Sequence, residues 1–159
     1  MLKTTTTRSP EQTAAVAQRI AATLGTGDTL LMSGPVGAGK SLFCRALIET
    51  LQRQADEPPE DIPSPSYTLI QTYRAGPLEI WHADLYRLGD ASELVELGLD
   101  EAFASVLALI EWPDRLGEMT PQRSLTLHLQ PDPDFDQGRR ITLSPKGAGW
   151  TGVIKAAVA

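Results

Sequence analysis

The segment GPVGAGKS, from Gly34 to Ser41, decides the fold. It directly follows DTLLMS, a short apolar run suited to a buried strand. After it, Phe43, Leu47 and Leu51 recur at helical spacing. A strand that leads through a glycine-rich loop into a helix is the context required by the phosphate-binding motif GxxxxGK[ST]. The sequence therefore predicts a P-loop NTPase-like α/β fold.

Each residue type in this loop has a physical role. Gly34, Gly37 and Gly39 let the backbone curl around phosphates in conformations that a Cβ would block. Lys40 is expected to reach the β and γ phosphates, and the Ser41 hydroxyl is expected to ligate magnesium. The positive end of the following helix also favours the anion. We therefore expect an NTP, most simply ATP, and magnesium as cofactors.

Two acidic residues at strand ends are candidates for the magnesium site. Glu111 ends the apolar run VLALI, where a P-loop enzyme carries its magnesium-binding carboxylate; the alternative is a surface residue at a strand exit. Asp84 ends the run before LYRL, and it either binds magnesium through water, orients the attacking water, or caps a helix. The sequence favours a functional role for both.

Other polar and aromatic residues allow two interpretations each. His82 precedes Asp84 by two positions, but a structural role is favoured over metal binding. Cys44 is interpreted as a small packing residue. Trp112 could stack near the nucleotide, although packing is favoured. A hydroxyl at Ser66 could reach the γ phosphate as a switch segment does, or simply belong to a turn entering a strand.

The composition is that of an ordinary globular protein. The chain has 159 residues, of which 42% are hydrophobic and 21% charged, so a single domain over residues 1–159 is expected. A net charge of -6 disfavours direct, tight binding of nucleic acid. The N-terminus MLKTTTTRSP lacks the apolar core of a signal peptide, and no apolar run approaches the roughly 18 residues of a membrane span. A cytoplasmic location without membrane attachment is expected.

The remaining pattern predicts three layers around a mixed, mainly parallel sheet, with an inserted β-hairpin and closing antiparallel strands. The acidic, proline-rich stretch from Ala55 to Pro63 is expected to be a mobile surface loop, and the tail from Gly149 to Ala159 a docking helix or a frayed end. The other expected elements are a helix capped by Ser9 that stops at Gly25, a hairpin of Tyr67 to Arg74 with Leu78 to Asp84, and a closing pair of Leu125 to Leu129 with Arg140 to Leu143. Short helices are expected at Asp90 to Leu97, with Leu94 and Leu97 inward, and at Asp100 to Ala104.

Five blocks of the chain resemble one known family. GPVGAGKS, SPSYTLIQTY, HADLYRL, ELVELGLDE and ALIEWPDRL occur in the order and spacing of the TsaE family, formerly called YjeE. The resemblance implies a bacterial ATPase that works with TsaB and TsaD in the threonylcarbamoyladenosine modification at position 37 of tRNA. By the same resemblance the chain would hydrolyse ATP on the TsaB and TsaD assembly and would meet tRNA only indirectly, through that complex.

The resemblance also assigns roles by motif. Lys40 would contact phosphate, Ser41 and Glu111 would hold magnesium, Asp84 would be needed for hydrolysis, and Ser66 would lie in the switch-like segment. Catalytic residues are thus Asp84 and Lys40. The predicted nucleotide-binding residues are Gly34, Val36, Gly37, Ala38, Gly39, Lys40, Ser41, Leu42 and Ser66.

Two departures from the family pattern stand out. Pro35 and Val36 replace an acidic residue and a leucine, so the loop loses an N–H group and a carboxylate at its edge. Ser41 and Ser66 replace threonines, and both keep the hydroxyl. The departures therefore preserve the predicted magnesium ligand.

Three other functions compete with this interpretation. A regulatory GTPase is suggested by DRLG, from Asp114 to Gly117, but no [NT]KxD for guanine follows. A small-molecule kinase would need an arginine-rich lid, and only Arg45, Arg74 and Arg87 lie near the predicted site. A nucleotide-gated binding subunit with negligible hydrolysis is the third. Because no clear arginine finger is evident, weak hydrolysis in isolation is expected.

Overall fold

All strands of the computed structural model, which describes residues 2–159, join one sheet. The strands are β1 (Lys3–Thr7), β2 (Thr29–Ser33), β3 (Ile70–Ala75), β4 (Leu78–Asp84), β5 (Leu107–Glu111), β6 (Ser124–Pro131) and β7 (Arg139–Lys146). The helices are α1 (Pro10–Ala21), α2 (Lys40–Gln54), α3 (Ser92–Glu96), α4 (Leu99–Ala102) and α5 (Thr151–Ala157), with a 3₁₀ segment η1 (Pro113–Met119).

The sheet is mixed, as the sequence predicts, with the order β1-β7-β6-β2-β5-β4-β3. The four central strands β6, β2, β5 and β4 are parallel to one another. Antiparallel pairing is confined to the flanks, where β3 pairs with β4, and β7 pairs with both β6 and β1. The inserted hairpin and the closing antiparallel pair are therefore confirmed.

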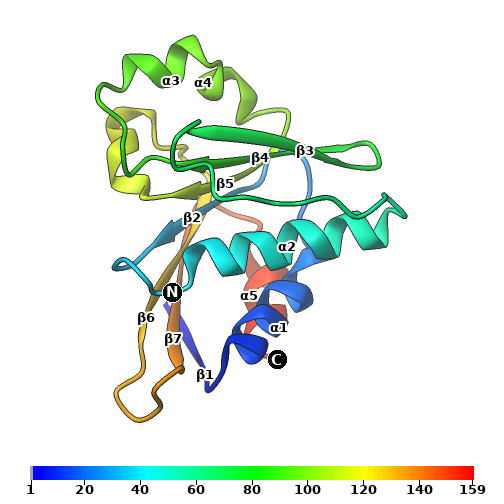
Figure 1. The fold of residues 1–159 in the computed structure, drawn as a ribbon, viewed down its shortest axis with the longest axis vertical. Coiled ribbons are helices and arrows are strands. Elements are labelled where there is room, and N and C mark those ends of the chain that lie inside the picture. Colours follow the sequence, from blue (N-terminus) through cyan, green and yellow to red (C-terminus); the bar gives the residue numbers. More distant parts are fainter. Residues whose placement is uncertain (1) are drawn as a thin grey trace.

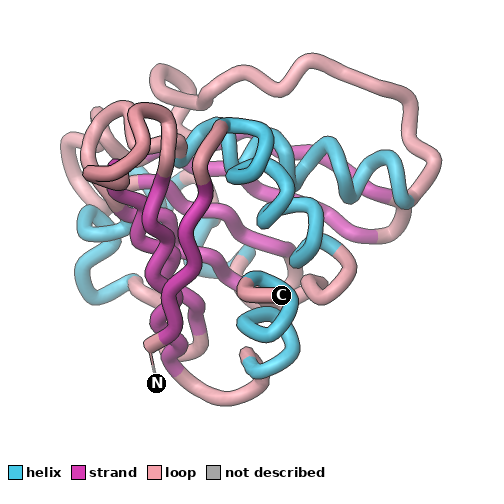
Figure 2. Tube along the Cα trace, turned by 90° about the horizontal axis from the view of Figure 1, so that it is seen from below, coloured by secondary structure: helices cyan, strands magenta, loops and turns pink. Residues whose placement is uncertain are grey.

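Helices cover both faces of this sheet (Figures 1 and 2). Along β2, Leu30 and Met32 face the helices α1, α2 and α5, whereas Leu31 faces the layer that contains α3 and α4. Successive residues of a strand point to opposite faces, so a strand buried on both faces is apolar throughout. The three-layer arrangement is thus confirmed.

The N-terminal helix begins where predicted and ends earlier. Ser9 Oγ accepts from the backbone N–H of Gln12 at 3.1 Å, and Pro10 is the first helical residue. The Gln12 side chain accepts from Arg8 N at 2.8 Å, one residue before the cap. The prediction that α1 runs to Gly25 is wrong, because its last helical residue is Ala21.

Three local predictions for β3 and for the segment around α3 are corrected. β3 begins at Ile70 and not at Tyr67, because residues 67–69 form a turn in which Leu69 has a positive φ of 67°. Leu97 is 45% exposed, so its predicted inward position is wrong, whereas Leu94 is fully buried as predicted. α3 itself spans only five residues.

The N-terminal strand β1 was not predicted from sequence. Its residues KTTTT offer no apolar alternation, and most of them are exposed or half-buried. The strand forms because the edge of β7 provides backbone partners, from Lys3 opposite Leu143 to Thr7 opposite Arg139. This pairing extends the closing antiparallel strands by one.

The acidic segment from Ala55 to Pro63 is a loop, as predicted, and side chains attach it to the domain. The Glu57 carboxylate accepts from the backbone of the β3–β4 turn at 3.0 Å. Gln52 donates to Glu60 at 2.7 Å, and the side chain of Ile62 is buried. The mobility expected for this loop stays a prediction.

The C-terminal tail is a docking helix, which settles one of the two alternatives. Helix α5 packs on α1, and the guanidinium of Arg19 donates to the carbonyl oxygens of Ala156 and Ala157. These bonds satisfy carbonyl groups that the end of a helix leaves free.

Among residues 2–159, every helix is too short or too polar to span a lipid bilayer.

The exit of β2 into the glycine-rich loop is the tightest backbone approach near the motif. Gly34 has a φ of +136°, and a Cβ at this position would lie 2.1 Å from the carbonyl oxygen of Leu129 in β6. Glycine is therefore required for two reasons at once, conformation and space. At Gly37 the φ is +80°, but a Cβ would meet nothing within 4 Å.

We expect Gly34→Ala to destabilise the fold by at least about 3 kcal/mol, because it adds a backbone clash to an unfavourable φ. The matched variant Gly37→Ala should cost only about 1–2 kcal/mol, which is the conformational penalty alone. Urea unfolding followed by circular dichroism measures both. Equal losses in the two variants would contradict the close approach to β6.

Candidate functional site

A cavity of about 430 Å³ opens where the loop after β2 meets the carboxyl ends of β4 and β5. In open α/β sheets, ligands bind at this end of the parallel strands. The cavity is lined by Val36, Gly37, Gly39, Lys40, Ser41, Leu42, Ser64, Ser66, Asp84, Tyr86, Arg87, Glu111 and Trp112.

Most of the residues singled out from the sequence meet at this cavity. Among the predicted catalytic, nucleotide-binding and magnesium-binding residues, the exceptions are Gly34 and Ala38, which belong to the loop but do not line the cavity. His82 and Cys44, for which a structural role was favoured, do not line it either. Ala38 is fully buried, and Gly34 packs against β6. Gly34 and Ala38 support the loop on the side that packs against the domain.

Strand register brings the two carboxylates together. β4 and β5 are parallel, and Asp84 lies directly opposite Glu111 in the ladder. β2 pairs with the other edge of β5, with Met32 opposite Glu111, so the loop after β2 starts at the same end of the sheet. Parallel pairing therefore places two acids from distant parts of the sequence beside the P-loop.

The first residue pair of the site is Ser41 with Glu111. Ser41 Oγ lies 2.9 Å from Oε1 and 3.2 Å from Oε2 of Glu111, and the Glu111 side chain is only 2% exposed. A buried carboxylate is costly unless hydrogen bonds compensate it. Hydroxyl and carboxylate oxygens are also the ligands that magnesium prefers, so the pair predicted to hold magnesium fits that ion.

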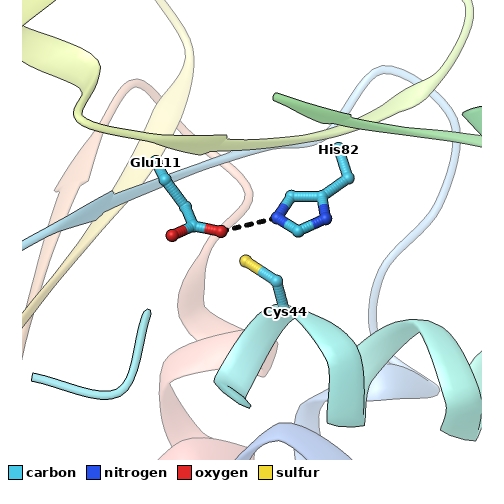
Figure 3. Close-up of side chains that lie close together, drawn as sticks. All are labelled: Cys44, His82 and Glu111. Carbon is cyan, nitrogen blue, oxygen red and sulfur yellow. Dashed lines mark hydrogen bonds and ion pairs between the residues drawn. The ribbon is translucent and has the colours of Figure 1, made fainter. Parts of the chain in front are cut away.

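The second partner of Glu111 is His82. The Nε2 atom of His82 lies 2.6 Å from Oε2 of Glu111, and both side chains are buried (Figure 3). Since a carboxylate only accepts, Nε2 is the donor. Nδ1 of His82 has no hydrogen-bond partner among residues 2–159. The structural interpretation of His82 is therefore incomplete, because His82 holds a candidate metal ligand rather than pairing with Asp84.

Lys40 is folded back onto the loop that precedes it. Its Nζ donates to the carbonyl oxygens of Gly34 at 2.7 Å and Pro35 at 2.9 Å, and it lies 4.1 Å from the ring centroid of Trp112. Burial lowers the pKa of Lys40 from its ordinary value, and the negative charges of Glu111 and Asp84 oppose that shift. The ammonium is thus held at the cavity by neutral acceptors and an aromatic face.

Asp84 is fixed by three donors from two segments. Its Oδ1 accepts from the backbone N–H of Tyr86 at 3.0 Å. Its Oδ2 accepts from Ser66 Oγ at 3.1 Å and from Ser64 Oγ at 3.5 Å. The segment after the acidic loop is therefore tied directly to the end of β4, at the place where the sequence suggested a switch-like role.

The family comparison agrees with this geometry. The model of the family described as threonylcarbamoyl adenosine biosynthesis protein TsaE matches residues 7–141. The chain belongs to the TsaE family. The match extends beyond the five blocks into α1, β6 and β7.

Individual TsaE relatives are similar over most of their length. A Rickettsia bellii protein named tRNA threonylcarbamoyladenosine biosynthesis protein TsaE is 37% identical over 122 residues, which cover 77% of this chain and 82% of the relative. A Bacillus subtilis protein of the same name is 36% identical over 142 residues, covering 89% and 84%. The crystal structure of Bacillus subtilis YdiB superposes with a TM-score of 0.78 at 28% identity, covering 99% of this chain and 94% of that one.

The aromatic rim of the cavity in this TsaE-family chain was largely missed from the sequence. The rings of Tyr86 and Trp112 lie 5.0 Å apart between centroids, and the guanidinium of Arg87 lies 4.6 Å from the ring of Tyr67. Packing was favoured for Trp112, which does pack against the core on the α3–α4 side of the sheet. It also lines the cavity, with a positive φ of 59°. The sequence signal for Tyr86 and Arg87 was their position in the segment LYRL, directly after the strand-ending Asp84.

Arg139 in β7 contacts the P-loop, and no pattern in the sequence predicted this contact. Its Nε donates to the carbonyl of Ala38 at 2.8 Å and its Nη2 to that of Gly37 at 3.1 Å. The guanidinium thereby holds the P-loop through two of its carbonyl groups. About 100 residues separate these partners in sequence, and only the β6–β7 hairpin brings them together.

Cys44 lies fully buried beside His82 and Glu111, one turn into α2. Burial raises the pKa of the Cys44 thiol well above its ordinary value, and the charges of Glu111 and Asp84 raise it further. Its position supports the predicted packing role, because a neutral thiol behaves as a small apolar group. The thiolate, which is the reactive form, is disfavoured.

We expect Cys44 to resist iodoacetamide in the folded protein at neutral pH, because the thiol is both buried and protonated. It should react readily after unfolding in guanidinium. Mass spectrometry measures the alkylated fraction with time under both conditions. Rapid labelling of the folded chain, as fast as in guanidinium, would show that the thiol is neither buried nor protonated.

Proposed function

We propose that this chain is a magnesium-dependent ATPase that serves threonylcarbamoyladenosine modification of tRNA on an assembly of TsaB and TsaD. The observation that carries the proposal is the contact of Ser41 Oγ with both carboxylate oxygens of Glu111, at the first turn of the helix after a GxxxxGK[ST] loop. The family assignment supports the pathway. ATP, magnesium and the two partners follow from the motif chemistry and the family resemblance.

The P-loop supplies the phosphate grip. Lys40 Nζ now donates to the carbonyls of Gly34 and Pro35, and the β and γ phosphate oxygens of a nucleotide would replace these neutral acceptors with charged ones. The N-terminal end of α2 begins at the same point, so its free N–H groups would favour a bound phosphate. Charge-assisted bonds to phosphate are stronger than the bonds they replace.

Ser41 and Glu111 would hold the magnesium ion. A bound magnesium ion would supply positive charge that stabilises the charge developing during phosphoryl transfer. Ser41 would offer its hydroxyl oxygen, and Glu111 would bind the ion directly or through a water. His82 would keep the Glu111 carboxylate oriented by its bond to Oε2, as outer hydrogen bonds do for metal ligands.

Asp84 is the candidate for handling the attacking water. Its carboxylate is held by the backbone of Tyr86 and the hydroxyl of Ser66, so it is oriented before any substrate arrives. A fixed carboxylate at the cavity can orient a water and accept its proton. Ser66, which lies in the segment after the acidic loop, would transmit any movement of that segment to Asp84.

The proposal requires protein partners for efficient turnover. Arginine from a partner or from the chain itself can raise phosphoryl-transfer rates by orders of magnitude. Arg87 lines the cavity, but its guanidinium is stacked on Tyr67. With a net charge of -6, the chain is also poorly suited to bind tRNA by itself. The stacked position of Arg87 is consistent with stimulation by TsaB and TsaD. The negative net charge is consistent with indirect contact with tRNA.

The competing functions receive less support from the geometry. Asp114 of the DRLG segment is 75% exposed and does not line the cavity, so it is poorly placed to sense a γ phosphate as a GTPase would. Arg45 donates to the carbonyl of Ile62, and Arg74 pairs with Glu79 at the exposed hairpin. Neither arginine lines the cavity, which weakens the small-molecule kinase alternative.

We expect slow phosphate release from ATP by the isolated protein and at least about tenfold stimulation when TsaB and TsaD are added. Lys40→Ala should lower the stimulated rate by about 100-fold, because it removes a charged donor aimed at the reacting phosphate. A coupled phosphate-release assay measures all three. The matched control is Lys155→Ala on α5, which should leave the rate unchanged. An unchanged rate with the partners, or a preference for GTP, would contradict the assignment.

Glu111→Gln should weaken nucleotide binding in the presence of magnesium by about tenfold or more and leave magnesium-free binding nearly unchanged. The reason is that an amide keeps the size of the side chain but binds a divalent cation poorly. Calorimetric titration with a non-hydrolysable ATP analogue, with and without magnesium, measures the difference. Glu118→Gln, at an exposed position in η1, is the control. Full magnesium dependence in Glu111→Gln would remove this residue from the site.

A further inference from the structure

Three metal-ligating side chains gather directly beneath the cavity. Cys44 in α2, His82 in β4 and Glu111 in β5 are all buried, and their ligand atoms lie within 4.8 Å of one another (Figure 3). The magnesium chemistry described above uses only the carboxylate of this group. The imidazole only orients that carboxylate, and the thiol has no role in nucleotide binding.

The donor set differs in kind from that of magnesium. Sulfur, imidazole nitrogen and carboxylate oxygen together are typical ligands of zinc and related divalent ions, whereas magnesium prefers oxygen alone. We propose that Cys44, His82 and Glu111 form a second cation site, for a soft divalent ion of the zinc class, and that this ion and the magnesium–nucleotide complex exclude each other. Three protein ligands leave a fourth position for water, the pattern of an open zinc site.

The spacing of the three atoms suits such an ion after small side-chain movements. Zinc bonds of about 2.0–2.3 Å in a tetrahedral arrangement separate neighbouring ligand atoms by roughly 3.3–3.7 Å. The Nε2 of His82 and Oε2 of Glu111 are 2.6 Å apart, so this pair would open by about 1 Å. Cys44 Sγ lies within 4.8 Å of the other two ligand atoms, so it would need to approach by no more than about 1.5 Å.

An ion can reach the cluster through the cavity. Glu111 lines the cavity although its side chain is only 2% exposed, so its carboxylate forms part of the floor between solvent and the buried pair. The charge of the ion would be balanced by the Glu111 carboxylate and by a Cys44 thiolate formed on binding, with release of a proton. The Nε2 proton of His82 would move to Nδ1, which has no hydrogen-bond partner among residues 2–159, so that Nε2 could bind the ion. Proton release makes binding stronger as pH rises.

Mutual exclusion follows from the shared carboxylate. Glu111 contacts Ser41 on one side and His82 on the other. A soft ion that takes Oε2 toward Cys44 and His82 draws the carboxylate away from Ser41, and the magnesium ligand set is broken. The exclusion rests on the proposed function, whereas binding of the soft ion does not.

The test is titration of the nucleotide-free, reduced protein with cobalt(II), which substitutes for zinc and reports its ligands by absorption. We expect one ion per chain and a thiolate-to-cobalt charge-transfer band in the near ultraviolet. Because Cys44 is the only cysteine in the chain, this band identifies its sulfur without a variant. Zinc should displace the cobalt and abolish the band. A cobalt spectrum without a thiolate band would overturn the proposal.

Cys44→Ser is the matched variant, because it exchanges a single atom, sulfur for oxygen, and so removes the soft ligand with little change in size. We expect zinc affinity to fall by at least about tenfold and magnesium-dependent nucleotide binding to remain. Cys44→Ala serves the same purpose if the serine variant folds poorly. Equal zinc affinity in the wild-type protein and in a folded variant would contradict the site.

Saturating magnesium and ATP together should suppress the cobalt band in the wild-type protein. If the band persists while the nucleotide is shown to be bound, exclusion is wrong. If the band forms and no nucleotide binds under any condition, the proposed ATPase function fails and the soft-ion site stands. The two failures are therefore separable in one set of titrations.

Discussion

The buried carboxylate of Glu111 is the constraint on which the site depends. At 2% exposure it must be hydrogen-bonded, because an uncompensated buried charge costs several kcal/mol even after relaxation. Ser41 supplies one partner from the first turn of α2, and His82 supplies the other from β4. The same two bonds connect a helix and two strands, so compensating the charge also fixes the relative positions of the elements that form the cavity.

The parallel centre of the sheet makes this arrangement possible. β4, β5 and β2 end at the same edge, which puts Asp84, Glu111 and the glycine-rich loop side by side. The antiparallel flank contributes from a distance through Arg139, whose guanidinium holds two carbonyls of the loop. Central strands therefore supply the candidate chemistry, and a flanking strand stabilises the loop that would bind phosphate.

Local signals predicted the parts of the molecule that are governed by local physics. The P-loop, β2, α2 and the strand-ending Glu111 follow from glycine placement, apolar runs and helical spacing, and the sequence located all of them. His82 and Glu111 are 29 residues apart in sequence, and their pairing depends on the register between β4 and β5, which no spacing rule reveals. β1 forms on an available edge although its sequence has no apolar alternation, and Leu97 is exposed at the C-cap position of α3.

The central claim is that Glu111 and Ser41 form a cation site at the phosphate end of the P-loop. A crystal structure with a non-hydrolysable ATP analogue and manganese in place of magnesium tests it most directly, because manganese is located by its anomalous scattering. The account predicts an anomalous peak bonded to Ser41 Oγ, with the Glu111 carboxylate bound directly or through one water, beside the β and γ phosphates. A peak remote from both side chains, with the nucleotide in the cavity, would contradict it.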